Sequence, residues 1–160
     1  MKNKRGFLLA EETLKIVLAV IAISFLIYFL TSLYFAKVNS EKLRQAEAVL
    51  KGDSEGSIKM AIYSDKNSTE FHLQSPKSWY LFGFVGDGKP NSCAGENCLC
   101  ICDKVLIDTF FGIGNSRQIK ECDEDGICLI VQNLKEFDKI KIKQQFISIK
   151  KIDNNIEIIE

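Results

Sequence analysis

The chain has 160 residues, of which 46% are hydrophobic and 26% are charged, and its 21 basic residues balance 21 acidic ones. This composition excludes a disordered or collagen-like chain. The zero net charge gives no electrostatic reason to bind nucleic acid or acidic polymers. The chain has six cysteines and a single histidine, so the redox state of its compartment matters for its structure.

An uninterrupted apolar segment lies near the N-terminus. No charged residue occurs from Ile16 to Ala36, and about 20 apolar helical residues cross the hydrocarbon core of a bilayer. We therefore expect a membrane span over about 16–36. The run is longer than the apolar core of a removable secretory signal, and Tyr34 makes a poor cleavage site at Ala36. The segment is predicted to stay in the chain as an anchor.

Charge and cysteine usage together predict the orientation of this span. Lys2, Lys4 and Arg5 precede it, which is typical of a cytoplasmic N-terminus. Basic residues also follow the span, so the cysteines decide: six of them fit an oxidising exterior better than a reducing cytosol. We expect the chain from about residue 37 onward to lie outside the cytoplasmic membrane.

A short motif precedes the apolar segment. A basic leader, residues 1–6, ends in Gly6, Phe7 follows directly, and Glu11 is the fifth residue counted from Phe7. Over about residues 4–36 this pattern resembles the class III signal of type IV pilins and pilin-like proteins. The resemblance implies that a prepilin peptidase, an intramembrane aspartyl protease, cuts after Gly6. It also implies that the apolar segment becomes the first half of a long helix in the core of a filament.

The chemistry of Glu11 fits this resemblance. Cleavage would leave a free α-amino group on Phe7, while the apolar residues between them would draw Glu11 toward the membrane, where an unpaired carboxylate is costly. The amine of the same or a neighbouring subunit is a suitable partner, and in the pilin family that pairing is thought to set the register of incoming subunits. In an ordinary signal anchor, Glu11 would instead complement the helix dipole and pair with Lys15.

The helix is expected to extend from residue 7 to residue 51. Good helix formers dominate 37–51, and no proline interrupts them. Apolar residues recur there at helical spacing, namely Leu43, Ala46, Val49 and Leu50. This stripe is predicted to pack on the outer domain, and Gly52 is predicted to end the helix in a linker over 52–56. A free stalk, or a separate helix capped near Asn39, is the alternative.

Residues 57–160 are expected to form an extracytoplasmic β domain. Helical periodicity gives way to alternation, which predicts an antiparallel sheet with one solvated face. The expected strands are 57–63, 70–73, 78–85, 98–107, 127–132, 137–143, 146–151 and 156–160, the last two forming a hairpin. The fold class is therefore α+β, with a long N-terminal transmembrane and amphipathic helix followed by a disulfide-bonded antiparallel β-sheet domain.

All six cysteines lie in this β domain, at Cys93, Cys98, Cys100, Cys102, Cys122 and Cys128. Three of them alternate along one predicted strand, so they face one side and need partners elsewhere. Six cysteines allow fifteen pairings. We expect Cys93 to pair with Cys98, which leaves Cys100 and Cys102 for the last two. A metal site is the alternative, but the spacing differs from the paired Cys-x2-Cys of structural zinc, so we predict no bound metal.

Other candidate chemistry is sparse. His72 is expected to be structural or exposed, and residues 123–126 to form a charged turn, because they lack the ligand spacing of an EF-hand loop. Residues 112–114 lack the third glycine of a dinucleotide loop. Asn67 begins a glycosylation sequon in a predicted loop. We find no nucleophile–base constellation, and therefore expect no catalytic residue, no cofactor and no enzymatic activity.

Two functions are consistent with these features. The first is a structural subunit, major or minor, of a type IV pilus-like surface filament. Its partners would be the prepilin peptidase, identical or related pilin subunits, and membrane lipid before assembly, with no nucleic acid contact. It would pass from the cytoplasmic membrane, as a single-pass protein with its N-terminus inside, to a cell-surface filament. The alternative is a bitopic signal-anchored surface protein whose β domain binds a ligand or partner.

Overall fold

The computed structural model describes residues 4–53, 56–103 and 113–160, with side chains over 12–53, 56–103 and 118–160. The described chain falls into two compact units, Met1–Ser40 and Glu41–Glu160. The first unit is the apolar part of the long N-terminal helix. The second contains the end of that helix and the β domain.

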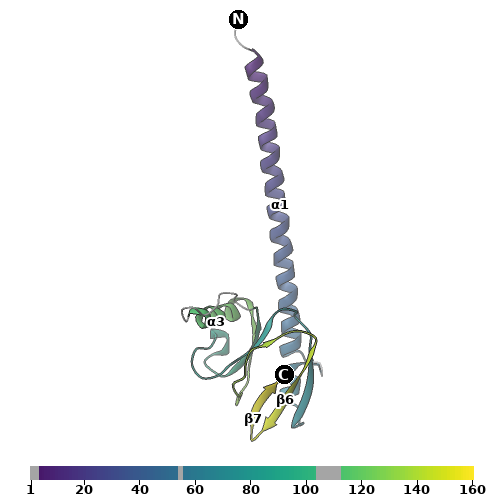
Figure 1. Cartoon of the computed structure of the whole chain (residues 1–160), viewed down its shortest axis with the longest axis vertical. Helices are drawn as coiled ribbons and strands as arrows, with labels where there is room; N and C mark the ends of the chain where they lie inside the picture. Colours follow the sequence, from purple (N-terminus) through teal and green to yellow (C-terminus); the bar gives the residue numbers. More distant parts are fainter. Residues whose placement is uncertain (1–3, 54–55, 104–112) are drawn as a thin grey trace. The chain divides into compact units, whose positions relative to one another are not determined.

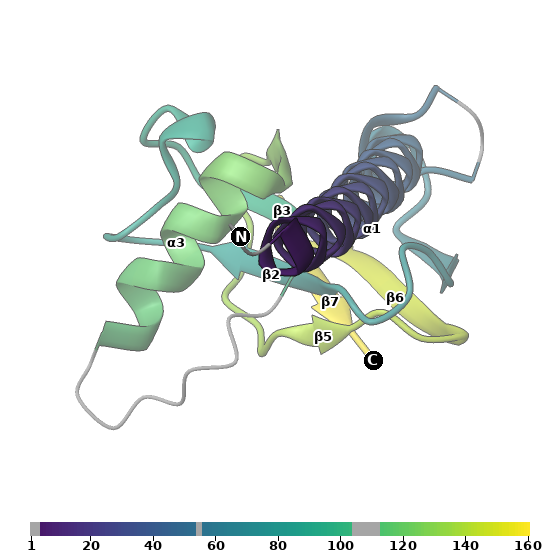
Figure 2. The ribbon, with the colours of Figure 1, turned by 90° about the horizontal axis from the view of Figure 1, so that it is seen from above.

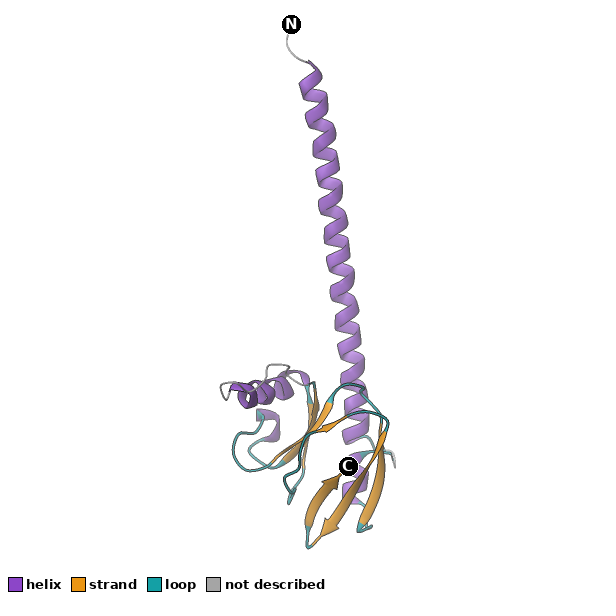
Figure 3. Ribbon diagram, in the orientation of Figure 1, coloured by secondary structure: helices purple, strands orange, loops and turns teal. Residues whose placement is uncertain are grey.

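Helix α1 runs without a break from Lys4 to Lys51 and has 48 residues (Figures 1 and 3). A separate helix capped near Asn39 is therefore excluded. The helix ends as the sequence predicts, because the N–H of Gly52 donates to the carbonyl of Ala48 at 3.1 Å. A Cβ at position 52 would collide with that carbonyl oxygen, so a glycine is needed there.

The C-terminal part of α1 belongs to the core of the second unit. Ala46 and Leu50 are fully buried, and Leu43 and Val49 pack against the same core. The predicted apolar stripe is thus confirmed, and the free-stalk alternative is wrong for these residues. The Nζ atom of Lys42, on the same stretch of helix, lies 5.9 Å from the centroid of the Trp79 ring.

Residues 57–63, which we expected to be a strand, instead form the short helix α2 (Ile58–Tyr63). Ser57 caps it: its hydroxyl accepts a hydrogen bond from the N–H of Met60 at 3.2 Å and donates one to the carbonyl of Gly52. The buried residues Ile58, Ala61 and Ile62 have helical spacing. The expectation failed because Ile58, Met60 and Ile62 also alternate as a strand would.

One sheet consists of β1 (Ser68–Leu73), β6 (Gln145–Ile152) and β7 (Asn155–Ile159), in the order β1-β6-β7 and antiparallel throughout. Strands β6 and β7 form the predicted hairpin (Figure 1). Asp153 and Asn154 connect them with positive φ angles of 50° and 64°. Such angles are typical of the tight turns that match the twist of paired strands, and Asp and Asn tolerate them well.

The second sheet has the order β4-β3-β2-β5 and is also antiparallel. Its strands are β2 (Tyr80–Phe84), β3 (Cys98–Cys102), β4 (Ile127–Ile130) and β5 (Ile140–Lys141). Strand β5 is much shorter than the expected 137–143. The alternation there still sorts the side chains correctly, because the isoleucines are buried and the lysines are exposed.

The two sheets, α2 and the end of α1 contribute to one hydrophobic core. Its largest fully buried side chains are Trp79, Leu50, Ile58, Leu73, Leu81, Leu99, Ile101, Ile142, Ile147 and Ile149. Residues from well-separated parts of the chain therefore meet in this core, as expected for a single domain of about 100 residues.

Helix α3 (Ile113–Asp125) lies beside β3 and contacts it (Figure 2). It corrects two expectations. Helical structure does not disappear after residue 57, and residues 123–125 are the last turn of a helix rather than a charged turn. The expected strand 98–107 ends at Cys102 in the structure, and residues 104–107 lie outside the described residues. Gly112, the first residue of the segment 112–114 that was compared with a dinucleotide loop, also lies outside them.

Candidate functional site

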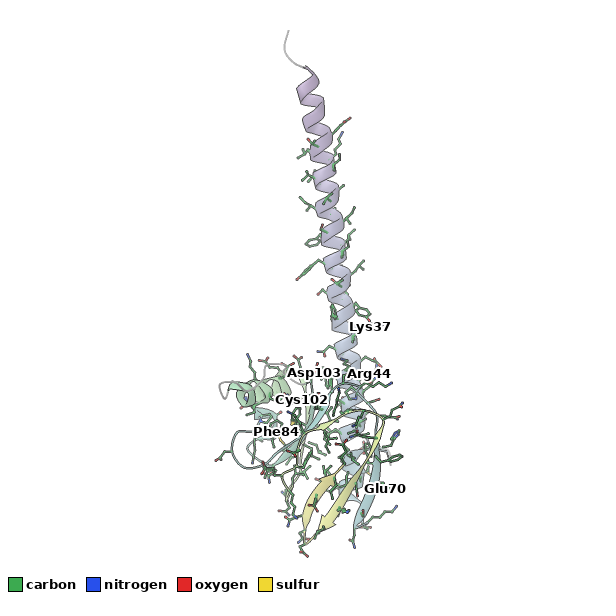
Figure 4. All side chains as sticks on the ribbon, in the orientation of Figure 1. Lys37, Arg44, Glu70, Phe84, Cys102 and Asp103 are labelled. Atoms are coloured by element: carbon green, nitrogen blue, oxygen red, sulfur yellow. A yellow bond between two sulfur atoms is a disulfide. The ribbon has the colours of Figure 1, made fainter. Side chains whose placement is uncertain are left out.

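The N-terminal part of α1 presents an apolar surface. Its large apolar side chains from Ile16 to Phe35 are between 52% and 72% exposed, and Figure 4 shows side chains on both sides of this part of the helix. A continuous apolar surface of this kind needs lipid or other protein around it. By length and composition, α1 can cross a membrane.

Two hydroxyl groups within this apolar part are bonded to the helix itself. Ser24 donates a hydrogen bond to the carbonyl of Val20 at 2.8 Å, and Thr31 donates to the carbonyl of Ile27 at 2.9 Å. In hydrocarbon, an unpaired hydroxyl would be costly, and back-bonding to the preceding turn removes that cost. Ser24 and Thr31 are therefore compatible with burial in lipid or in a helix bundle.

The residues of the processing motif lie at the start of α1. The backbone of Gly6, Phe7 and Glu11 is helical, but their side chains lie outside the described residues. Their roles in cleavage and docking therefore remain predictions. The first described side chain of the helix is that of Glu12, which is exposed.

Strand β3 has two different buried faces. Leu99 and Ile101 point into the hydrophobic core, whereas Cys98, Cys100 and Cys102 belong to a separate cluster of cysteines. All five residues are fully buried. The alternation in the sequence therefore places the three cysteines on one face, as predicted, with Phe82 and Phe84 of β2 packed against the cluster.

Three disulfides connect this face of β3 to three other segments. Cys93 of η1 (Asn91–Cys93) pairs with Cys98, as expected from the sequence, with Cα atoms 5.8 Å apart. Cys100 pairs with Cys128, its direct neighbour across β3 and β4. Cys102, labelled in Figure 4, pairs with Cys122 of α3. The bridges therefore tie η1, β4 and α3 to one central strand.

Polar contacts reinforce these bridges at the α3 end. The Gln118 side-chain amide donates to the carbonyl of Asp103 at 2.8 Å, and its nitrogen lies 3.6 Å from the sulfurs of Cys102 and Cys122. Burial raises the pKa of Glu121, and the nearby carboxylate of Asp125 raises it further. The helix end next to the third bridge is therefore rich in acidic groups.

The sulfur atoms of Cys93, Cys98, Cys100 and Cys128 all lie within 4.8 Å of one another. In the oxidised chain they form two disulfides and provide no thiolate for a metal ion. The sequence did not predict this group, because its members come from η1, β3 and β4 and are brought together by strand pairing. The only local signal was the alternation of cysteines on β3.

The remaining candidates lie elsewhere in the second unit. His72 is exposed on β1, where its ring stacks on that of Phe146 with centroids 4.8 Å apart. Asn67 is exposed just before β1, in the loop where the sequon was expected, and its carbonyl accepts a hydrogen bond from the N–H of Lys151 at 2.8 Å. It borders an open pocket of about 510 Å³ together with Tyr63.

A comparison of the chain with protein-family models, curated proteins and solved structures finds no match in any of the three. What the structure provides is a long apolar N-terminal helix followed by a disulfide-bonded antiparallel β domain. This arrangement is compatible with a pilin-like architecture. It is equally compatible with a signal-anchored surface protein.

Proposed function

We propose that the chain is a structural subunit, major or minor, of a type IV pilus-like surface filament. The main support is the continuity of α1, which is exposed and apolar in its N-terminal part and contributes buried residues to the core of the β domain in its C-terminal part. One continuous helix can thus join an assembly segment to a folded domain. The motif around Gly6 adds the signal for processing.

The apolar helix would lie in membrane lipid before assembly and against the helices of related subunits afterwards. Lipid tails are as apolar as leucine side chains, so moving the helix from lipid into a bundle brings little hydrophobic gain. Apolar surface alone therefore does not select the axial position of a subunit. A pair of opposite charges in the same environment can select the axial position, because a subunit at the wrong height leaves a charge unpaired.

Glu11 and the α-amino group of Phe7 supply such a pair once a prepilin peptidase has cut after Gly6. Before cleavage the peptide nitrogen of Phe7 carries no charge, so only the matured subunit has a cationic partner for the carboxylate. Processing and docking are thereby connected. The precursor stays in the membrane, and the matured chain enters the filament.

The β domain would form the exterior of the filament and needs no chemistry of its own. Its three disulfides suit an oxidising exterior. We propose a structural rather than an enzymatic role for it. The partners of the whole chain would be the peptidase, other subunits and lipid, with no nucleic acid contact.

Matched substitutions in α1 test the docking role. We expect Glu11→Gln to be cleaved normally but to give few or no filaments, because the neutral amide cannot balance the new amine. Glu12→Gln changes the next residue in the same way, and it should assemble normally. Filament yield by electron microscopy is the measurement, and equal yields for the two variants would contradict the role of Glu11.

A change at the cleavage site separates the filament subunit from a plain anchor. Replacing Gly6 by a bulky residue, as in Gly6→Leu, should leave the precursor uncut in the membrane and abolish filaments. A signal-anchored surface protein would show no difference in mass between this variant and the native chain, apart from the substitution itself. Normal maturation of the variant would therefore count against the proposal.

A further inference from the structure

Two of the three disulfides lie side by side. The sulfur of Cys100 is 3.8 Å from the sulfur of Cys93 and 3.8 Å from the sulfur of Cys98. With Cys128, the four sulfurs fit within 4.8 Å of one another. Cys93, Cys98 and Cys100 are fully buried, and Cys128 is 8% exposed.

These distances match those of a tetrathiolate metal site. In a tetrahedral zinc site the zinc–sulfur distance is about 2.3 Å, which places neighbouring sulfurs about 3.8 Å apart. Two of the distances in the cluster already have this value. Opening the two bridges would free the side chains to rotate toward this spacing, while pairing of β3 with β4 holds the backbone of Cys98, Cys100 and Cys128.

The surroundings of the sulfurs favour a metal ion over free thiolates. Phe82 and Phe84 pack against the cluster, and apolar surroundings raise the free-energy cost of an isolated thiolate. A divalent cation removes most of that cost by neutralising charge on its four ligands. Thiolate ligands also select zinc and similar soft or borderline metals over magnesium or calcium.

We propose that Cys93, Cys98, Cys100 and Cys128 bind one divalent zinc-type metal ion as a tetrathiolate when both bridges are reduced. Oxidation of this site forms the Cys93–Cys98 and Cys100–Cys128 bonds, releases the metal ion and frees four electrons. Two molecules of a disulfide oxidant accept these electrons with four protons and become two dithiols. The metal-bound and the disulfide forms are thus two redox states of one cluster.

The third bridge is not part of this site. Among the described residues, the group of sulfurs within 4.8 Å contains neither Cys102 nor Cys122. Their sulfurs lie instead beside the side-chain amide of Gln118. This pair therefore serves as an internal control in the same molecule. The proposal does not depend on the filament role, since it concerns the β domain alone.

A protection experiment on the native chain tests the proposal. The full chain, in detergent micelles, is reduced with a phosphine, which competes weakly for metal, and is alkylated with and without one equivalent of Zn²⁺. Peptide mass mapping should find Cys102 and Cys122 alkylated in both samples and the other four cysteines protected by zinc. Equal alkylation of all six in both samples, or equal protection of all six, would overturn the proposal.

Cobalt binding provides a second readout with matched variants. Reduced native chain should bind one equivalent of Co²⁺ and show the visible absorption bands of tetrahedral cobalt thiolate. We expect Cys128→Ser to weaken cobalt binding by at least about tenfold, whereas the double variant Cys102→Ser/Cys122→Ser should bind as the native chain does. Binding that the control pair abolishes and Cys128→Ser leaves intact would contradict the assignment.

Discussion

The carboxylate of Asp123 in α3 accepts a hydrogen bond from the backbone N–H of Ser92 in η1, with Oδ1 and nitrogen 2.8 Å apart. Its other oxygen, Oδ2, accepts from the side-chain amide of Asn91 at 2.6 Å. The two segments joined by these bonds also carry Cys93 and Cys122, which are bridged to the two ends of β3. Hydrogen bonds and disulfides thus hold the same part of the domain together.

This contact predicts a pH-dependent stability. The hydrogen bond from the backbone N–H of Ser92, and after it the one from the Asn91 side-chain amide, lowers the pKa of Asp123 below its usual range. A lowered pKa in the folded chain stabilises the fold above the unfolded pKa of about 3.9. That contribution is lost as the pH falls through the lower pKa of the folded chain.

We therefore expect Asp123→Asn to lower the denaturant midpoint of the full chain near neutral pH, and the difference from the native chain to shrink toward about pH 2. Asp87→Asn, a change at an exposed aspartate in the loop after β2, is the control and should leave the midpoint unchanged. A difference of the same size at both pH values would show that the carboxylate charge is not the cause.

The ring of Phe137 lies so close to Gly83 that adding a single methyl group there should destabilise the fold. A Cβ at this position in β2 would lie only 2.9 Å from Cδ1 of Phe137 and nearer still to Cε1. We expect Gly83→Ala to cost about 1–3 kcal/mol in the free energy of unfolding, the usual range for an overpacked core. Adding Phe137→Leu should recover part of this loss. Strictly additive effects of the two changes would argue against the contact.

The disulfides are expected to differ in their contribution to stability. The Cys100–Cys128 bridge spans 28 residues and the Cys93–Cys98 bridge spans 5. By the chain-entropy relation, the longer loop is worth about 1.5 kcal/mol more. Replacing each pair by two serines changes the same kind of buried atoms, so the two variants can be compared directly by denaturant unfolding. A larger loss for the Cys93–Cys98 variant would contradict this order.

Two leucines of α1 should respond differently to truncation. Leu50 is fully buried in the core of the second unit, whereas Leu30 is 63% exposed. We expect Leu50→Ala to destabilise the β domain by about 2–5 kcal/mol. Leu30→Ala should leave the unfolding of that domain in detergent unchanged, since its side chain is not part of the core. The near-ultraviolet signal of the buried Trp79 follows both transitions, and equal losses would contradict the role of the stripe.

The sequence predicted those parts of the fold in which local pattern and burial agree. The long helix, its end at Gly52 and its buried stripe at Ala46 and Leu50 are confirmed. So are the β6–β7 hairpin and the single face shared by Cys98, Cys100 and Cys102. Each depends on residues close together in the chain, whose spacing sets which side chains share a face.

The remaining features required long-range information. The sequence predicts a strand at α2 because its six residues fit both the helical and the strand period of apolar residues. The N-cap at Ser57 favours the helix. Helix α3 is polar and has no clear apolar stripe in its sequence; a disulfide at Cys122 fixes it to β3. The four-sulfur group could not be predicted from spacing, because strand pairing places Cys128 opposite Cys100.

The mass of the mature N-terminus tests the central claim most directly. Native chain isolated from the cell surface should begin at Phe7, with residues 1–6 removed, because a prepilin peptidase is proposed to act after Gly6. The measurement needs no variant and no assumption about the β domain. A chain that still begins at Met1 or Lys2 would contradict the filament proposal and favour a signal-anchored surface protein.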